Sequence, residues 1–331
     1  MKTQRCLSVI IACYRDAGSI REFYRQLSEI LPTVTPNYEI VYVNDASPDQ
    51  CEEILNELAA RDPRLVVVNH TRNFGSQNAF LSGMRVSRGD AVVLMDGDLQ
   101  DPPAVIPALV EKWLEGFDVV YGVRARRKET LFRQVAYKMF YRLFRWMSPF
   151  QIPVDAGDFG LIDRKVVRCL LEDFPERLVF LRGLRAYTGF KHAGVDYVRQ
   201  ARFDGCSTNS LKRNLEWAKL AIFSFSHKPL EYISLFALLA VALTMTAAVA
   251  YFVTFLVKGE APSGFMTQLL VTLFLGSVQL VCFAIIAEYL GHIYEEIKRR
   301  PRYIVRDVID NRQPPEYSRP QDATGDKFSV A

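Results

Sequence analysis

Two long apolar stretches constrain this chain more than any other feature of its sequence. Residues 229–257 carry one charged side chain, Glu231, and residues 265–290 carry only Glu288, near their end. About 20 apolar residues in a helix cross the hydrocarbon core of a bilayer. A buried hairpin of a soluble protein is the alternative, and these lengths disfavour it. We therefore expect two transmembrane helices, with residues 206–228 as a juxtamembrane segment before them.

Positive charge flanks the two stretches on one side. The connector of residues 258–264 is short, Lys298 to Arg302 form a basic run after the second stretch, and a cationic segment precedes Pro229. Because cytoplasmic flanks are enriched in Lys and Arg, we expect a multi-pass protein of the plasma (inner) membrane with both termini in the cytoplasm. The N-terminus lacks the apolar core of a signal peptide. Residues 291–331 are expected to be a cytoplasmic tail with a disordered end.

Residues 1–205 alternate between strand-like and helix-like patterns. Apolar, β-branched runs predict strands at 7–14, 38–46, 65–70, 91–95 and 117–123. Helical spacing predicts helices at 17–31 and 48–58, a third that follows Gly75 and ends at about residue 87, and a fourth at 105–114. The alternation predicts a doubly wound α/β domain, whose ligands bind beyond the carboxyl ends of the strands.

An acidic turn ends the central predicted strand. Five apolar residues are followed by Asp96, Gly97 and Asp98, and a double proline closes the turn at Pro103. Side chains alternate along an extended chain, so Asp96 and Asp98 project to one side, and Gly97 lets a ligand approach the backbone. Two carboxylates held this close favour a bound cation, and hard oxygen ligands suit Mg²⁺ or Mn²⁺ carrying a diphosphate. An acidic surface turn without a ligand is the alternative.

Two other predicted strands also end in polar residues. Tyr14 and Asp16 follow the first strand, and Asp45 follows the second. Capping of the next helix and binding of a base are equally open for Asp16, whereas Asp45 is the better candidate to accept hydrogen bonds from a base or ribose. The G-x-G-x-x-G fingerprint and the Walker A sequence are both missing, which disfavours nicotinamide and flavin enzymes. A nucleotide would be held through a metal and side chains.

Residues 124–150 are basic and rich in aromatic side chains. Three interpretations are open: a core-facing helix, a nucleic-acid patch, and an interfacial membrane helix. The last is favoured because large apolar residues crowd more than one helical face and the rim is cationic. A net charge of +4 is too small to argue for nucleic acid. We expect no nucleic-acid partner.

Several motifs together resemble those of the polyprenyl-phosphate glycosyltransferases of glycosyltransferase family 2, the group that includes dolichyl-phosphate mannose synthase and bactoprenol glucosyltransferases. They are Val43-Asn44-Asp45-Ala46-Ser47, Arg72-Asn73-Phe74-Gly75, Asp96-Gly97-Asp98-Leu99-Gln100-Asp101-Pro102-Pro103, Gly157-Asp158-Phe159 and Arg302-Tyr303. The resemblance implies a GT-A (Rossmann-like) nucleotide-sugar domain over 1–205, followed by two transmembrane helices. It also implies an inverting reaction and a homo-oligomer, a tetramer.

The resemblance and the charges together give each candidate residue a role. Asp158 and Asp98 are the catalytic candidates, and a divalent metal, Mg²⁺ or Mn²⁺, is expected on Asp96, Asp98 and Gln100. Nucleotide binding is expected at Tyr14, Asp16, Asp45 and Asp96. Acceptor-phosphate binding is expected at Arg124, Arg133, Arg202 and Ser207. Gly205-Cys206-Ser207-Thr208 departs from the G-E-S-K of the family, so contacts from this loop beyond Arg202 and Ser207 are not expected.

The expected reaction transfers a sugar from a nucleotide-sugar to polyprenyl (undecaprenyl) phosphate at the cytoplasmic face of the membrane. The expected donor is UDP-glucose or another UDP-sugar. The acceptor phosphate is already an anionic nucleophile, so Asp158 would take a residual proton or orient that phosphate. A GDP-mannose-using mannosyltransferase and a nonenzymatic membrane scaffold are the alternatives. A processive polysaccharide synthase is disfavoured because the chain lacks Q-x-x-R-W and has too few spans.

Overall fold

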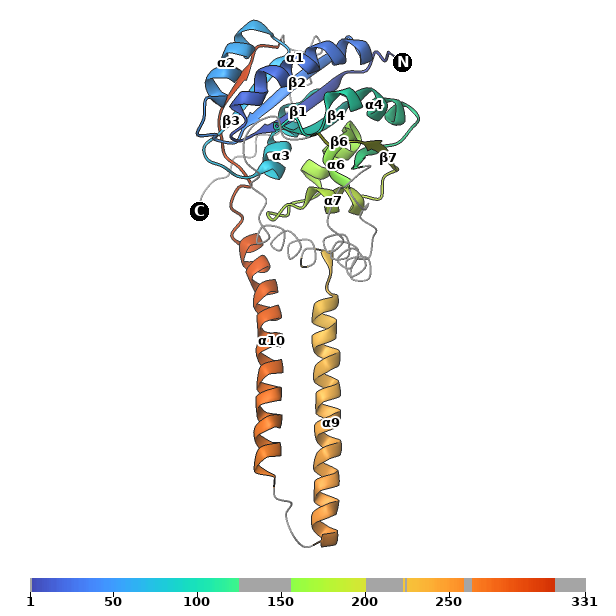
Figure 1. Cartoon of the computed structure of the whole chain (residues 1–331), viewed down its shortest axis with the longest axis vertical. Coiled ribbons are helices and arrows are strands. Elements are labelled where there is room, and N and C mark those ends of the chain that lie inside the picture. Colours follow the sequence, from blue (N-terminus) through green and yellow to red (C-terminus); the bar gives the residue numbers. More distant parts are fainter. Residues whose placement is uncertain (1, 125–155, 201–222, 224, 259–263, 313–331) are drawn as a thin grey trace, which may run out of the picture.

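Eight strands, seven from the first 200 residues and one from near the C-terminus, form one mixed sheet at one end of the two long helices (Figure 1). The computed structural model describes residues 2–124, 156–200, 223, 225–258 and 264–312. Its strands are β1 (Leu7–Cys13), β2 (Tyr38–Asn44), β3 (Leu65–His70), β4 (Ala91–Asp96), β5 (Val119–Arg124), β6 (Ala156–Asp163), β7 (His192–Tyr197) and β8 (Val305–Asp310). Their order in the sheet is β7-β5-β6-β4-β1-β2-β3-β8.

The middle of the sheet is parallel, as the sequence predicts. In the register of β1, β2 and β4, Cys13 is opposite Asn44 and Ala12 is opposite Asp96, so the carboxyl ends of the three strands lie at one edge. The sheet is nevertheless not parallel throughout, because β6 runs antiparallel to both β4 and β5. The chain leaves β5 and enters β6 at the same edge, where Val123 is opposite Ala156.

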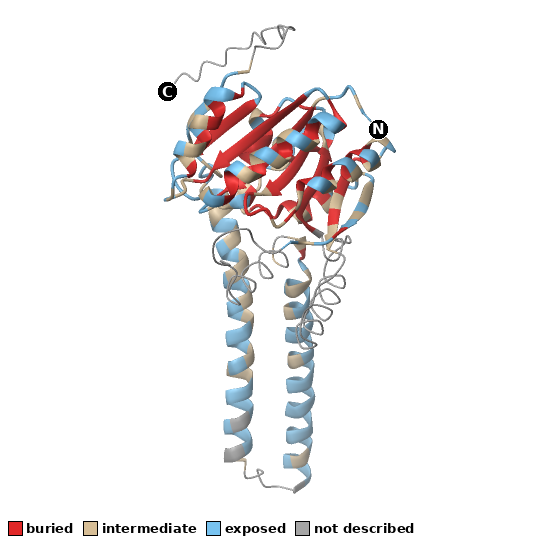
Figure 2. Ribbon diagram, turned by 45° about the horizontal axis from the view of Figure 1, so that its top comes forward, coloured by how far each residue is buried: buried red, intermediate tan, exposed pale blue. Residues whose placement is uncertain are grey.

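Helices cover both faces of the sheet. One face packs against α1 (Ala17–Val34), α2 (Cys51–Arg61), η1 (Pro103–Val105) and α4 (Ile106–Leu114), and the other against α3 (Ser76–Val86), α6 (Arg164–Glu172) and α7 (Leu181–Tyr187). Successive residues of β1 alternate between the two cores: Val9 and Ile11 belong to the first, and Ile10 and Ala12 to the second. This alternation is the two-sided burial of a doubly wound sheet. Figure 2 shows the buried residues gathered there.

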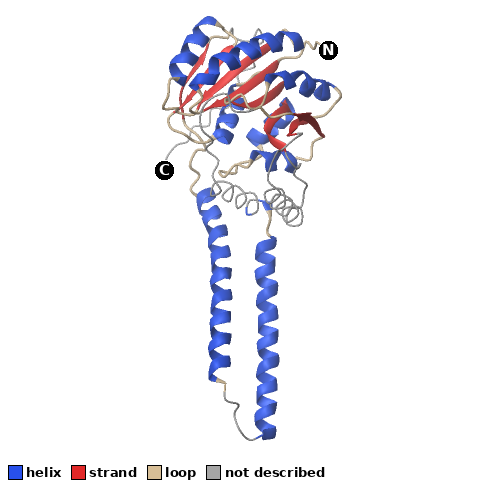
Figure 3. Ribbon diagram, in the orientation of Figure 1, coloured by secondary structure: helices blue, strands red, loops and turns tan. Residues whose placement is uncertain are grey.

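Two long helices extend side by side from the α/β domain (Figures 1 and 3). They are α9 (Lys228–Lys258) and α10 (Phe265–Ile297). Residues Lys228–Val257 and Thr267–Ile297 are long and apolar enough to cross a membrane, and the side chains described there are mostly exposed (Figure 2). The two expected apolar helices are therefore present. The second continues to Ile297, seven residues beyond the predicted Leu290.

The chain returns to the sheet after α10. Arg299 adopts a positive φ of 49° just after the helix, and residues 305–310 then form β8, antiparallel to β3. The sequence predicts a tail over residues 291–331, so this strand is a departure from the prediction. β8 covers the backbone edge that β3 would otherwise expose.

Candidate active site

Three loops with unusual backbone conformation meet at the carboxyl edge of the parallel strands. Arg15, Ala46 and Leu99 follow β1, β2 and β4, and each has a positive φ, of 61°, 51° and 57°. This left-handed region is unfavourable for residues with a Cβ, and such strain is concentrated at functional sites. The loops also contact one another, because the backbone N–H of Arg15 donates to Ser47 Oγ over 2.7 Å.

Buried negative charge gathers where β4 ends. Asp98 is about 5% exposed, and its Oδ1 accepts a hydrogen bond from the Gln100 backbone N–H over 3.1 Å. Burial, together with the nearby carboxylates of Asp101, Asp158 and Asp98, raises the pKa of Asp96 to about 7. A group of acids that resists ionisation in this way is stabilised by a cation.

Asp158, on β6, is held by arginines of α7. Arg182 binds it through both carboxylate oxygens, and Arg185 donates to the backbone carbonyls of Asp158 and Gly157 over 3.2 and 2.9 Å. Burial alone would raise the pKa of Asp158, but Arg182, Arg185 and Arg124 together hold it below its ordinary value. Asp158 is therefore a poor proton acceptor and a good anchor for Arg182.

Asp45, at the end of β2, is engaged by a neighbouring loop. Its Oδ1 is 2.8 Å from His70 Nδ1 and accepts from the Phe74 backbone N–H over 2.8 Å, and its Oδ2 accepts from the Gly75 N–H over 2.7 Å. The carboxylate is buried and organises the Arg-Asn-Phe-Gly loop, in which Gly75 has a φ of 88°. The position of Asp45 at a strand end predicts binding of a base or ribose, whereas these contacts with His70, Phe74 and Gly75 cannot be predicted from its local sequence.

Asp16 and Tyr14 lie in the loop after β1. The Asp16 Oδ2 accepts from the Tyr14 backbone N–H over 2.9 Å, and its side chain makes no capping hydrogen bond to α1. Asp16 therefore occupies the N-cap position of α1, and its carboxylate contacts the loop after β1 rather than the first turn of the helix. The Tyr14 ring is exposed, with the Arg15 guanidinium 5.5 Å from its centroid.

Comparison with known proteins agrees with this geometry. Residues 8–171 match glycosyl transferase family 2. An uncharacterized glycosyltransferase of Bacillus subtilis is 39% identical over 303 residues, which are 90% of this chain and 93% of the relative.

The chain belongs to glycosyltransferase family 2.

Further relatives of this family 2 glycosyltransferase include the bactoprenol glucosyl transferase of Shigella phage SfV, 36% identical over 303 residues, with 91% of this chain and 98% of the relative covered. A prophage bactoprenol glucosyl transferase homolog of Escherichia coli is 34% identical over 304 residues, with 91% and 99% covered. A solved glucosyl-3-phosphoglycerate synthase of Mycobacterium tuberculosis overlaps 66% of this chain and 78% of its own, with a TM-score of 0.46 and 18% identity, a likeness too low to carry an inference about ligands.

The described residues supply part of a donor set for a metal. Among the residues that the structure describes, no three His, Cys, Asp or Glu side chains are grouped closely enough to hold an ion. Asp96 and Asp98 lie at the carboxyl edge of the parallel strands, where α/β domains bind ligands. The excess of carboxylate charge around Asp96 fits a cation. Mg²⁺ commonly binds through one or two carboxylates together with substrate phosphates and water. The residues present fit that mode of binding.

Several residues of this family 2 glycosyltransferase were not predicted. The buried Asp101 accepts a hydrogen bond from the Tyr197 hydroxyl over 2.5 Å and lies 3.5 Å from Arg199 Nε, and these contacts join β7 to the acidic turn. Arg182 and Arg185 were missed as well. Asp101 belongs to a motif that the sequence shows. Its partners Tyr197 and Arg199, and the arginines Arg182 and Arg185, belong to no recognisable local motif.

Arg124, the last residue of β5, lies close to this group. Its Nε donates to the Tyr197 hydroxyl over 3.5 Å, and its guanidinium approaches Gly157 so closely that a Cβ there would be 3.3 Å from Nη2. The structure therefore brings Arg124 to the Asp158 side of the site. Arg133, Arg202, Ser207 and most of the basic segment 124–150 lie outside the described residues.

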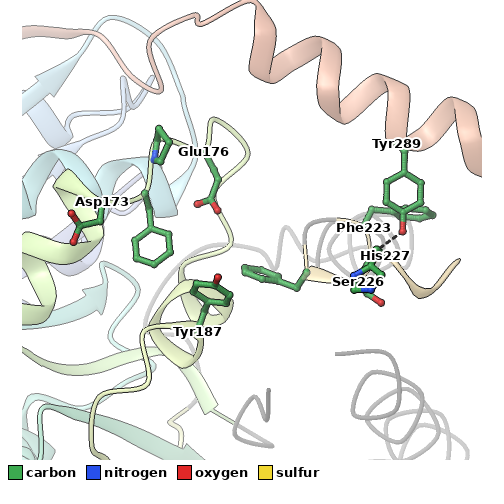
Figure 4. Close-up of a pocket in the computed structure, with 10 residues that line it drawn as sticks. Asp173, Glu176, Tyr187, Phe223, Ser226, His227 and Tyr289 are labelled. Carbon is green, nitrogen blue, oxygen red and sulfur yellow. Dashed lines mark hydrogen bonds between the residues drawn. The ribbon is translucent and has the colours of Figure 1, made fainter. Parts of the chain in front are cut away.

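A separate cavity of about 770 Å³ lies between the α/β domain and the long helices. Asp173, Glu176 and Tyr187 line one side, and Phe223, Ser226, His227 and Tyr289 line the other (Figure 4). Burial raises the pKa of Glu176, Glu296 raises it further, and Arg302 opposes them. With Asp173 and Glu176 in its wall, this cavity does not favour a phosphate.

Proposed function

We propose that the chain transfers a sugar, with inversion, from a nucleotide-sugar to polyprenyl phosphate at the cytoplasmic face of the membrane. One observation carries this proposal. The half-buried Asp96 ends the central strand and the buried Asp98 follows it, in a chain whose relatives, matched over 91% of its length, are named bactoprenol glucosyl transferases. We infer UDP-glucose as the first donor to test, because these relatives are named for glucosyl transfer.

The donor diphosphate would lie beyond β4. Asp96 and Asp98, with Gln100 nearby, would hold a Mg²⁺ or Mn²⁺ ion, which when bound neutralises the departing diphosphate. Tyr14, Asp16 and the loop organised by Asp45 border the same edge and would take the nucleoside. Every one of these groups follows a parallel strand of the sheet, where α/β domains bind nucleotides.

The acceptor phosphate would approach from the Asp158 side. Its anionic oxygen forms the new bond to the anomeric carbon, while the bond from that carbon to the diphosphate oxygen breaks and its electron pair leaves with the nucleotide. Attack opposite the leaving group inverts the anomeric centre. Because the nucleophile is already charged, the reaction requires no strong base, which agrees with the lowered pKa of Asp158. Arg182 and Arg124 would supply positive charge, with Arg133, Arg202 and Ser207 as further candidates.

The membrane would hold the lipid acceptor at this site. The polyprenyl tail must stay in lipid while its phosphate meets a water-soluble donor, so the site has to lie near the headgroups. Two apolar helices with basic residues at the domain end support a cytoplasmic site. The basic aromatic segment 124–150 would lie in the interface.

A donor screen tests the proposal. Purified full-length protein is incubated with polyprenyl phosphate, Mg²⁺ or Mn²⁺, and radiolabelled UDP-glucose, UDP-galactose or GDP-mannose, and lipid-bound label is counted. We expect label in lipid with a UDP-sugar. Label from GDP-mannose alone would select the mannosyltransferase alternative, and a failure of all donors would favour the scaffold.

A further inference from the structure

The chain that follows the second membrane-length helix lies against the candidate donor site. α10 ends at Ile297, and Tyr303 comes six positions later. The Thr71 backbone N–H, next to β3, donates to the Ile304 carbonyl over 3.1 Å, and β8 then pairs with β3. A segment separated from β3 by more than 200 positions thus becomes part of the same sheet edge.

Tyr303 contacts Asp45 indirectly, through the side chain of His70. Its ring stacks on His70, with centroids 5.5 Å apart and planes 12° from parallel. His70 Nδ1 lies 2.8 Å from Asp45 Oδ1, and the same carboxylate accepts the backbone N–H groups of Phe74 and Gly75. The His70 ring is also buried, so moving Tyr303 opens a space beside a group that positions Asp45.

Asp307 reaches the neighbouring loop by a second route. Its Oδ1 accepts from Asn69 Nδ2 over 2.7 Å, Asn69 Oδ1 accepts from Asn44 Nδ2 over 3.0 Å, and Asn44 Oδ1 accepts from the Ser47 backbone N–H over 3.0 Å. The side-chain amides of Asn44 and Asn69 each donate from nitrogen in the direction of β8 and accept at oxygen from the direction of Ser47. A single orientation of the two amide groups therefore satisfies all three hydrogen bonds. Asn44 and Asn69 are each about 1% exposed, which makes an unpaired amide costly.

The end of α10 is fixed separately. Glu296 Oε1 accepts from the Arg177 backbone N–H over 2.6 Å, and the Arg302 guanidinium donates to the Phe174 carbonyl. These contacts attach the end of the helix to the loop before α7 without involving the side chains of Tyr303 or Asp307. Loss of the Tyr303 or Asp307 contact alone therefore leaves the helix docked.

We infer that Tyr303 and Asp307 are positioning residues for the donor: they hold the loops of residues 44–49 and 72–75 at the spacing that the nucleotide requires. The inference rests on the proposed function, because it takes these loops as the nucleoside side of the site. On this inference, β8 and the residues just before it support the donor site structurally. Neither residue needs to touch the nucleotide.

Paired substitutions test this inference. Tyr303→Ala removes the stack, and Tyr303→Phe keeps it; Asp307→Ala removes the acceptor for Asn69, and Asp307→Asn keeps one. Asp310→Ala is the matched control, since Asp310 lies on the same strand and pairs with Arg312 and Arg88 away from the donor loops. All variants are made in the full-length chain.

The readouts are the donor KM, the acceptor KM, kcat and the thermal midpoint, together with UDP affinity in Mn²⁺ and hydrogen exchange at Phe74 and Gly75. We expect both alanine variants to raise the donor KM and the UDP Kd by roughly threefold to tenfold, the size of a lost aromatic or buried polar contact. Amide exchange at Phe74 and Gly75 should be faster in Tyr303→Ala, while the acceptor KM and kcat stay within about twofold. Tyr303→Phe, Asp307→Asn and Asp310→Ala should match the wild type.

An unchanged donor KM and UDP Kd in the alanine variants would overturn the inference, as would equal rises in donor and acceptor KM with a lowered thermal midpoint. If the wild type transfers no sugar, the proposed function fails. UDP affinity and amide exchange still decide the inference in that case.

Discussion

Arg182 donates two hydrogen bonds to the carboxylate of Asp158, from Nε to Oδ1 over 3.0 Å and from Nη2 to Oδ2 over 2.9 Å. This fork geometry fixes the guanidinium plane, and Arg182 remains 38% exposed at its side chain. A fixed, partly exposed guanidinium next to Asp158, whose own charge acts on Asp96, is suited to receive a phosphate. We therefore propose that the pair orients the acceptor phosphate and that Asp158 remains ionised during transfer.

The first prediction concerns Asp158 and pH. Because its folded pKa is held below the ordinary value of 3.8, Asp158 is already ionised throughout pH 5 to 8. Asp158→Asn should lower kcat/KM by about tenfold to a hundredfold, the cost of a lost charged hydrogen bond, and by the same factor at every pH in that range. A general base titrating near neutrality would instead make the factor change with pH, which a pH profile of both proteins detects.

The same shift predicts a dependence of stability on pH. A carboxylate with a depressed folded pKa stabilises the fold above its unfolded pKa, about 3.9, and this contribution is lost as pH falls through the folded pKa. The difference in unfolding free energy between the wild type and Asp158→Asn should therefore shrink below about pH 4. Denaturant titrations at pH 3 and pH 7 measure it, and a gap that widens at pH 3 would contradict the assignment.

The second prediction concerns the metal. Asp98→Ala should lower kcat by about a hundredfold to a thousandfold, because the leaving diphosphate loses part of its electrostatic stabilisation. The thermal midpoint should change little. Glu115→Ala is the control, since Glu115 is an exposed carboxylate paired with Lys112. Near-normal turnover of the wild type in excess chelator would refute the metal's role.

The parallel strands and their acidic loops were predictable because each is a local pattern: an apolar run, a turn, and Asp or Asn after it. β8 was not, because its six residues look like a polar tail until they meet the free edge of β3. The antiparallel β6 was missed for a similar reason, since strand direction depends on where the chain re-enters the sheet. Arg182 contacts Asp158 and Tyr197 contacts Asp101 only because the folded chain brings distant segments together. Such contacts have no characteristic spacing in the sequence and could not be predicted from it.

The third prediction concerns topology. A cysteine introduced by Ser263→Cys, in a chain whose native cysteines are replaced, should react with an impermeant thiol reagent added to intact cells. A cysteine placed at Ala331 should react only after the cells are opened, because basic flanks stay in the cytoplasm. The reverse labelling pattern would place the α/β domain outside.

The fourth prediction separates the two phosphate sites. Arg124→Ala and Arg133→Ala should raise the KM for polyprenyl phosphate by about tenfold to a hundredfold and leave the donor KM nearly unchanged, because each removes a charged hydrogen bond to the acceptor. Arg21→Ala is the control, since Arg21 pairs with Glu57 on the surface between α1 and α2. A rise in donor KM with normal acceptor KM would assign these arginines to the diphosphate instead.

The most direct test of the central claim measures nucleotide release with and without the lipid acceptor. Purified protein, Mn²⁺ and UDP-glucose should release UDP in proportion to added polyprenyl phosphate, with one glucose entering lipid for each UDP formed. Asp98→Ala should release almost none. Release of UDP at the same rate without polyprenyl phosphate, or no release with it, would contradict the account.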